Sequence, residues 1–228
     1  MSRPAFIGVI GLALGAGAAF ADFGNDDYTH VRSPGSEPGH ASILSSALGG
    51  SFSASGLDFS NGSITAIRNR DSGHYSGDQI WSAGTYNAKI VANHGSADAL
   101  FGYQNGSSGG HFQTLLDAED VGSMASTTMD SDFRWAIKVD GFIWDHVYTS
   151  REHDNYGKDM MVSYSIFNGM GSMIGSMLFF EDKKHHSDKD FNDVAVFLSV
   201  VPTPQAAGMG ALALLGGLSM TRRRSMAR

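Results

Sequence analysis

The sequence contains no cysteine. This absence excludes disulfide bonds, thiol nucleophiles and zinc sites built from cysteine. Small exported domains often depend on disulfides, so this chain, if exported, must gain its stability from a buried core, alone or with a bound metal. The sequence also has no glycine-rich phosphate loop placed before a helix, and it has little long helical periodicity.

Basic residues are scarce beside the acidic ones, and five of the 16 lie near the chain ends: Arg3, Arg222, Arg223, Arg224 and Arg228. All 23 acidic residues lie between positions 22 and 201, together with 11 basic residues, so this region carries a formal charge of −12. A protein that binds nucleic acid needs a basic face, so nucleic acid is excluded as a partner. The acidic balance fits affinity for cations, or solubility outside the cell.

Glycine is abundant, at 29 residues, and it recurs in dipeptides that are typical of tight turns. Four of these stand between apolar runs: Asn61-Gly62, Asn105-Gly106, Asp140-Gly141 and Asn168-Gly169. Each dipeptide can supply the positive φ angles that tight hairpins require. The sequence therefore predicts several β-hairpins along the chain.

Short apolar runs around these turns predict strands at residues 63–68, 87–92, 99–103, 133–139, 142–148, 161–167, 172–180 and 193–201. Many short strands at this spacing predict an all-β fold of the β-sandwich or jelly-roll kind. Residues 41–48 carry no charge and are expected to form one short helix or turn. The predicted domain covers residues 41–201 and follows a flexible, polar leader at residues 22–40.

Aromatic residues are plentiful, with 3 Trp, 14 Phe and 7 Tyr. Most of these large side chains are expected to fill the core. The alternative for Trp81 and Tyr103 is that one of them stacks on a sugar ring in an exposed groove.

The N-terminus has the pattern of a secretory signal peptide over residues 1–21. Arg3 is followed by an apolar stretch at residues 5–20, and Ala19 and Ala21 provide the small residues that signal peptidase requires. Cleavage is expected before Asp22. The alternative is an uncleaved anchor helix.

The C-terminal tail, residues 201–228, combines three features. Val201, Pro202, Thr203 and Pro204 interrupt regular structure, residues 206–220 carry no charge, and Arg222, Arg223 and Arg224 follow. An apolar run closed by arginines is typical of a segment that enters a membrane with the arginines left in the cytoplasm. The run is shorter than the about 20 residues of a full span, and the alternative is a loose hydrophobic terminus or a buried helix.

The order of these three parts resembles the bacterial PEP-CTERM sorting signal, with Thr203 standing where that family has Glu. The resemblance covers the last residues of the chain only. It implies a short transmembrane helix that holds the precursor briefly in the membrane, and processing by an exosortase, a membrane transpeptidase-like enzyme.

An acidic loop is predicted before the last strand. Glu181 and Asp182 end one apolar strand, and Asp188, Asp190, Asn192 and Asp193 lead into the next. Oxygen ligands at alternate positions can converge on one hard cation such as Ca²⁺. The loop is not an EF-hand, because Asp193 replaces the turn glycine and Ser199 replaces the bidentate glutamate. The alternatives are a solvated hairpin whose acids pair with Lys183, Lys184 and Lys189, or acids that cap backbone amides.

The segment from Phe179 to Asp193, with its FED and SDKDFND runs, is similar to a signature of exported β-rich domains of unknown function that precede PEP-CTERM tails. That family carries no established enzymatic activity. Its acidic motif is suspected of calcium binding.

Motifs for catalysis are weak. Residues 106–110 match G-x-S-x-G around Ser108, but no helix follows, as a nucleophile elbow would need. His185 and His186 are candidates for zinc or copper, although neighbouring residues of a strand point to opposite faces. Glu152 and Glu181 are a candidate glycosidase pair, and the sequence does not bring them together.

These observations predict an exported, non-catalytic protein of the cell surface or exopolysaccharide matrix, stabilised by Ca²⁺. Its expected partners are signal peptidase, an exosortase-type enzyme, the membrane through its tail, and extracellular polysaccharide. The alternatives are a calcium-dependent carbohydrate-binding module and a secreted glycoside-active enzyme.

Overall fold

A computed structural model describes residues 28–71, 78–141, 145–183 and 187–200. Several sequence predictions lie outside these residues: the signal peptide with Ala19 and Ala21, the sorting motif at Val201, Pro202, Thr203 and Pro204, the membrane helix at residues 206–220, Arg222, Arg223 and Arg224, and the pair His185 and His186. Among the described residues, no helix is both long enough and apolar enough to span a bilayer.

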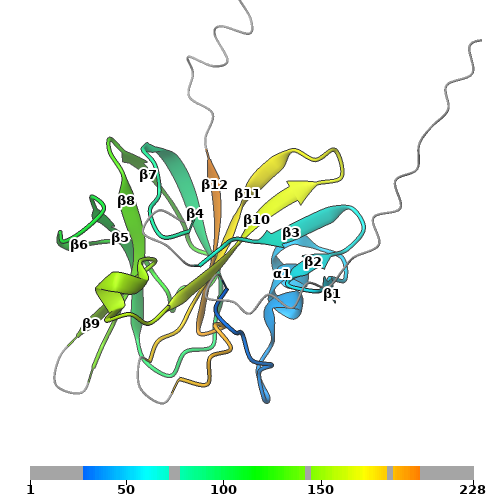
Figure 1. Cartoon of the computed structure of the whole chain (residues 1–228), viewed down its shortest axis with the longest axis horizontal. Helices are drawn as coiled ribbons and strands as arrows, with labels where there is room; N and C mark the ends of the chain where they lie inside the picture. Colours follow the sequence, from blue (N-terminus) through cyan, green and yellow to red (C-terminus); the bar gives the residue numbers. More distant parts are fainter. Residues whose placement is uncertain (1–27, 72–77, 142–144, 184–186, 201–228) are drawn as a thin grey trace, which may run out of the picture.

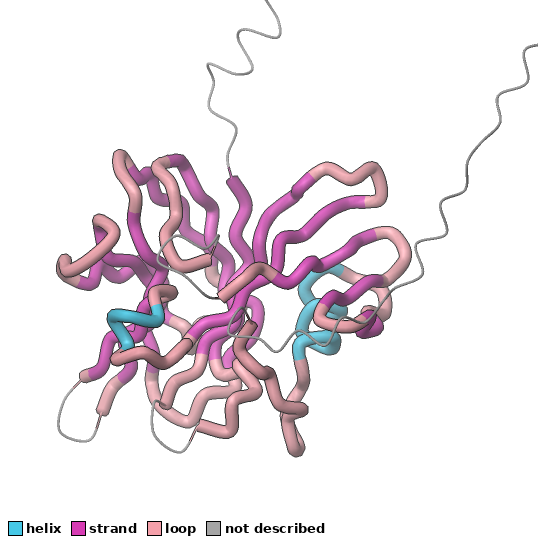
Figure 2. Tube along the Cα trace, viewed as in Figure 1, coloured by secondary structure: helices cyan, strands magenta, loops and turns pink. Residues whose placement is uncertain are grey.

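The described chain is mostly strand, arranged in two antiparallel sheets with one short α-helix (Figures 1 and 2). The larger sheet has the order β1-β2-β3-β10-β11-β12-β4-β7, and the smaller has the order β6-β5-β8-β9. The bounds in the larger sheet are β1 Ser53–Ser55, β2 Asp58–Ser60, β3 Ile64–Arg68, β4 Gly84–Asn93, β7 Met124–Met129, β10 Met161–Asn168, β11 Met173–Phe180 and β12 Val194–Val200. Those in the smaller are β5 Ala99–Asn105, β6 Phe112–Asp117, β8 Phe133–Val139 and β9 His146–Thr149.

The predicted all-β character is confirmed, and so is the short helix, which is α1 at His40–Leu48. Ile43 and Leu44 of this helix are buried, and it ends at Gly49, whose φ of 79° suits glycine. A 3₁₀ turn, η1 at Glu152–Asn155, follows β9. Strands β1, β2, β6 and β7 were not among the predicted elements.

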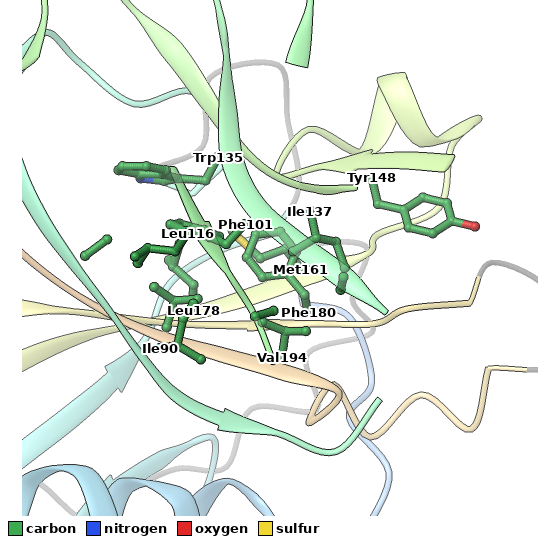
Figure 3. Close-up of a cluster of buried hydrophobic side chains, with 14 of the residues drawn as sticks. Ile90, Phe101, Leu116, Trp135, Ile137, Tyr148, Met161, Leu178, Phe180 and Val194 are labelled. Carbon is green, nitrogen blue, oxygen red and sulfur yellow. The ribbon is translucent and has the colours of Figure 1, made fainter. Parts of the chain in front are cut away.

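The larger sheet is buried on both faces at its centre, where the side chains of β11 alternate between two hydrophobic clusters. Leu178 and Phe180 join a cluster shared with the smaller sheet, which includes Phe101 and Trp135 (Figure 3). Met177 and Phe179 join a second cluster that contains Ile43 and Leu44 of α1. Side chains alternate across a strand, so a strand buried on both sides reads as the continuous apolar run found at residues 177–180. This burial fixes the start of the acidic loop, which leaves β11 at Phe180.

The turn predictions are confirmed at two places and corrected at one. Gly62 between β2 and β3 and Gly106 between β5 and β6 have φ of 86° and 79°. Between β10 and β11 the positive φ, 75°, lies at Gly171 instead of Gly169. The reason is that the Asn168 side-chain oxygen accepts hydrogen bonds from the amides of Met170 and Ser172, which moves the left-handed residue further along the turn. The turn at Asp140-Gly141 borders residues outside the described set.

The N-terminal segment, residues 28–39, lies within the region expected to be a flexible leader and is hydrogen bonded to the body of the protein at several points, which include a bond from Arg68 to the Thr29 carbonyl. The Thr29 amide donates to Asp71 Oδ2 at 2.6 Å, and the Arg32 amide donates to the Lys189 carbonyl at 2.8 Å. The Pro38 carbonyl accepts from Asn192 Nδ2 at 3.2 Å. The contacts of Arg32 and Pro38 are made with the acidic loop.

Candidate metal centre

The acidic loop, residues 181–193, joins β11 to β12, and the structure describes 181–183 and 187–193 of it. Glu181, Asp188 and Asp190 each offer one oxygen, and these oxygens lie within 4.8 Å of one another. Calcium binds oxygen at about 2.4 Å, so ligand oxygens around one ion are at most about 4.8 Å apart. The three carboxylates therefore fit around one Ca²⁺. This convergence is an acidic cluster that could hold a metal ion.

Two of these carboxylates and a neighbouring amide are buried with an unsatisfied oxygen. Glu181 is 1% exposed, Asp190 2% and Asn192 0%. Among the described residues, Glu181 Oε2, Asp190 Oδ1 and Asn192 Oδ1 have no hydrogen-bond partner. A buried polar atom without a partner costs about 1–3 kcal/mol, and more when it is charged. A bound ion or an ordered water is the usual partner of such an atom.

The backbone of the loop is held in an unusual conformation on both sides of Asp190. Lys189 and Phe191 have φ of 63° and 53°, in the left-handed region that residues other than glycine seldom adopt. Phe191 is 1% exposed and packs in the cluster of α1, so burial of its ring holds the loop in place. Its amide donates to Glu181 Oε1 at 2.7 Å. The buried Phe191 ring and this hydrogen bond therefore hold Asp190 beside Glu181, and the left-handed backbone on both sides of Asp190 is strained.

The electrostatics of the cluster favour a bound cation. Burial raises the pKa of Asp190 to about 6, and the neighbouring charges of Asp188, Glu181 and Glu37 add to the effect. Burial also raises the pKa of Glu181, while the Ser187 hydroxyl and the Phe191 amide act against it. Repulsion between neighbouring carboxylates is reduced when one of them binds a proton or when a cation binds between them. The donor set, three carboxylates, is the hard-oxygen chemistry of Ca²⁺.

Asp182 and Asp193, two other predicted ligands, are engaged elsewhere. Asp182 Oδ2 accepts hydrogen bonds from the amides of Ser96 and Ala97 at 2.9 and 3.3 Å. Asp193 Oδ2 accepts from the Asp182 amide at 2.8 Å. Burial raises the pKa of Asp193 to about 8, with the Asp182 amide acting against it and the Asp182 charge adding to it. This pair ties the acidic loop to the turn after β4.

Lysine pairing does not account for the cluster in the described residues. Among them, no lysine or arginine forms an ion pair with Glu181, Asp188 or Asp190, and the nearest approach to the loop's acids is Lys183 Nζ to Asp182 Oδ1 at 3.9 Å. Lys184 lies outside the described set.

The candidate nucleophile Ser108 lies away from the acidic loop. Ser108 lies in a β-hairpin turn between β5 and β6, and the carbonyls of Gly106 and Ser107 accept hydrogen bonds from Arg134 and Arg151 at 3.1 and 2.8 Å. No helix follows this turn; strand β6 does.

Trp81 and Tyr103 are half-buried, and their rings pack on the edge of Trp135 in the core. Glu152 lies in η1 after β9 of the smaller sheet, whereas Glu181 follows β11 of the larger one.

Sequence reasoning missed three residues that act on the acidic loop: Ser187, which belongs to the loop, and His40 and Glu37, which lie before it in the chain. His40 Nε2 lies 3.0 Å from the Phe191 carbonyl, and its ring stacks on Phe179 with centroids 3.9 Å apart. The only sequence signal was indirect: a histidine directly before an uncharged helical run.

The sequence matches no protein-family model, and a comparison with curated proteins finds no match either. The site's own chemistry therefore carries the functional argument.

Proposed function

We propose that this is an exported, non-catalytic protein of the cell surface or extracellular matrix, with a β-sandwich body stabilised by Ca²⁺ in the acidic loop. Its C-terminal tail is a sorting signal that an exosortase-type enzyme processes. The observation that carries the proposal is the convergence of Glu181, Asp188 and Asp190 with two buried oxygens left unpaired.

Calcium suits the site better than the alternatives. No cysteine exists in the chain, and the described cluster contains no histidine, so the soft ligands that favour zinc or copper are missing from it. Magnesium demands near-octahedral geometry at about 2.0–2.1 Å, whereas calcium tolerates irregular sets of carboxylate, amide and water oxygens. The extracellular setting proposed from the chain ends also provides calcium without a dedicated carrier.

The experiment that tests the proposal is thermal unfolding with and without calcium. Saturating CaCl₂ is expected to raise the Tm relative to EGTA, because an ion that binds only the folded state stabilises it by about 2.7 kcal/mol at a hundredfold excess over Kd. Asp190→Asn is expected to abolish the gain, and Asp130→Asn, an exposed acid in the turn after β7, is the matched control that retains it. A wild-type Tm that is the same in CaCl₂ and EGTA would remove calcium from the proposal.

A further inference from the structure

The hairpin of β10 and β11 ends in a tip that exposes three apolar side chains. Met170 in the turn is 87% exposed, and Met173 and Ile174, the first residues of β11, are 53% and 37% exposed. Neighbouring residues of a strand point to opposite faces, so Met173 and Ile174 leave apolar surface on both faces of the hairpin. We call residues 168–174 the hairpin tip. Exposed apolar side chains that gather in one place mark a site of contact with a protein or a membrane.

The hairpin tip lies at the end of the larger sheet where the described chain ends. Ser176 pairs with Leu198 in the register of β11 and β12. Ile174 and Val200 each lie two residues further toward this end, so Ile174 is level with the last residue of β12. Figure 1 shows the turn between β10 and β11 and the end of β12 on one side of the molecule, and the acidic loop on the other.

The uncharged run of the tail follows the end of β12 closely. Residues 201–205 separate β12 from the run at residues 206–220. These five residues span at most about 18 Å when fully extended. If the run enters the bilayer, as proposed, the end of the sheet is kept close to the membrane surface, and the hairpin tip with it.

The turns around the hairpin tip carry no charge. Strand β3 pairs with β10, so the turn between β2 and β3 lies beside the tip. Residues 61–63 and 168–172 contain no charged side chain. Asp130 and Asp132 also lie at this end, after β7, which forms the far edge of the sheet. The surface next to the tip can therefore approach lipid without burying a charge.

The acidic loop lies at the opposite end of β11. The eight residues of β11 extend over about 26 Å, which exceeds the Debye length of about 10 Å at 0.1 M salt. Repulsion between the acids of the loop and anionic lipids is therefore screened when the hairpin tip touches a membrane. The charge distribution suits an approach with the tip toward the bilayer and the acidic loop toward solvent.

The backbone of the turn is prepared to leave water. The amides of Met170 and Ser172 both donate to Asn168 Oδ1, at 3.0 Å each. The Gly171 amide donates to the Asn168 carbonyl at 2.9 Å, and the Asn168 amide donates to the Ser172 carbonyl at 2.9 Å. A backbone group that enters lipid must find its hydrogen bond within the protein. The amides of this turn already have one.

A membrane suits the hairpin tip better than another protein surface does. A protein that packs on a sheet covers one of its faces, whereas the exposed side chains here lie on both faces and in the turn between them. Lipid surrounds an inserted turn on all sides. The position of the tip beside the tail also brings it to the bilayer without a further partner.

We propose that the hairpin tip is a membrane-contacting element, which inserts Met170, Met173 and Ile174 into the interfacial region of the bilayer and orients the tethered precursor with its acidic loop toward solvent. This inference rests on the proposed membrane tail. It adds a direct contact between the folded domain and lipid.

The absence of cysteine allows a direct test. Met170→Cys introduces a single thiol that can carry an environment-sensitive fluorophore. With the full chain in vesicles of phosphatidylethanolamine and phosphatidylglycerol, we expect the emission to shift to shorter wavelength and to be quenched by a nitroxide attached to the lipid. Met124→Cys is the control, because Met124 is 71% exposed and begins β7 at the other end of the sheet. Its label should show neither effect.

Met173→Asp, added to the labelled Met170→Cys chain, tests the apolar character of the tip. A carboxylate at this exposed position is expected to remove the wavelength shift and the quenching, because a charge resists transfer from water to lipid. The variant should keep the Tm of the parent chain. It should also still float with the vesicles in a density gradient, since its tail is unchanged.

The outcomes separate this inference from the proposed tail. A chain that floats with the vesicles but shows neither shift nor quenching overturns the inference and leaves the tail standing. A wavelength shift without quenching by the lipid nitroxide assigns the tip to contact with another copy of the chain, and it also overturns the inference. Both signals retained in Met173→Asp would overturn the role of the apolar side chains. A chain that does not float overturns the membrane tail and the inference together.

Discussion

Asp190 stands between two residues with left-handed backbone, and its carboxylate is buried against Glu181. A side chain in this position cannot be replaced without losing either the charge or the packing around it. The spacing of Asp188 and Asp190 in the sequence was enough to predict that these two would act together. It could not show that Asp182 and Asp193 face another way, because that depends on amides from the turn after β4, which is distant in the sequence.

Because Asp190 is a proposed ligand, we expect calcium binding to depend on pH. The pKa of Asp190 is about 6 in the folded protein without metal, so a proton occupies the carboxylate below that pH and calcium must displace it. Affinity should therefore be constant above about pH 7 and fall by up to about tenfold per pH unit below 6. Calorimetric titration at pH 5 and pH 7.5 measures the effect, and equal Kd values at the two pH values would contradict the assignment of Asp190 as a ligand.

The strands show which elements a sequence pattern can find. Strands β8, β10, β11 and β12 were predicted because buried apolar residues define them. The missed strands are β1, β7 and β6, which form sheet edges, and β2 beside one of them. Edge strands bury little surface, as the polar sequence of β7 illustrates, so they carry no strong hydrophobic alternation. Their positions are set by the neighbours they pair with, which only the folded chain brings together.

The close pairing of β11 with β12 predicts that a side chain cannot be added at Gly175 without a loss of stability. A Cβ added at Gly175 would lie 2.2 Å from the Leu198 carbonyl oxygen and 2.7 Å from the Phe197 ring. Gly175→Ala must therefore push the two strands apart, and we expect it to lower the free energy of unfolding by about 1–3 kcal/mol. Chemical denaturation measures the loss, with Gly35→Ala, which meets nothing within 4 Å, as the control. A variant as stable as the control would show that the strands are not packed this closely.

The whole molecule is an acidic body between two apolar end segments, and its proposed location depends on those ends. Both end segments are predictions from composition and from the order of residues, and both lie outside the described part of the chain. The binding partners of the folded domain cannot be predicted in the same way, because no single stretch of sequence encodes them.

We expect the protein recovered from its native host to lack residues 1–21 and to be shortened near residues 201–204. Signal peptidase accounts for the first change and an exosortase-type enzyme for the second. Intact-mass measurement of the purified protein detects both, together with any group added at the new C-terminus. An unprocessed chain in the soluble cytosolic fraction would contradict the proposed export.

Strand β12 begins directly after the acidic loop and ends at Val200, where the tail sequence starts (Figure 1). Its seven residues span about 23 Å at the rise of an extended strand. The strand is hydrogen bonded on both sides, to β11 and β4, so it forms a rigid connection between the acidic loop and residue 200. In the proposed precursor, held in the membrane by its tail, β12 would separate the acidic loop from the membrane attachment. The proposed calcium could then bind the acidic loop before the tail is processed, and processing would leave the loop unchanged.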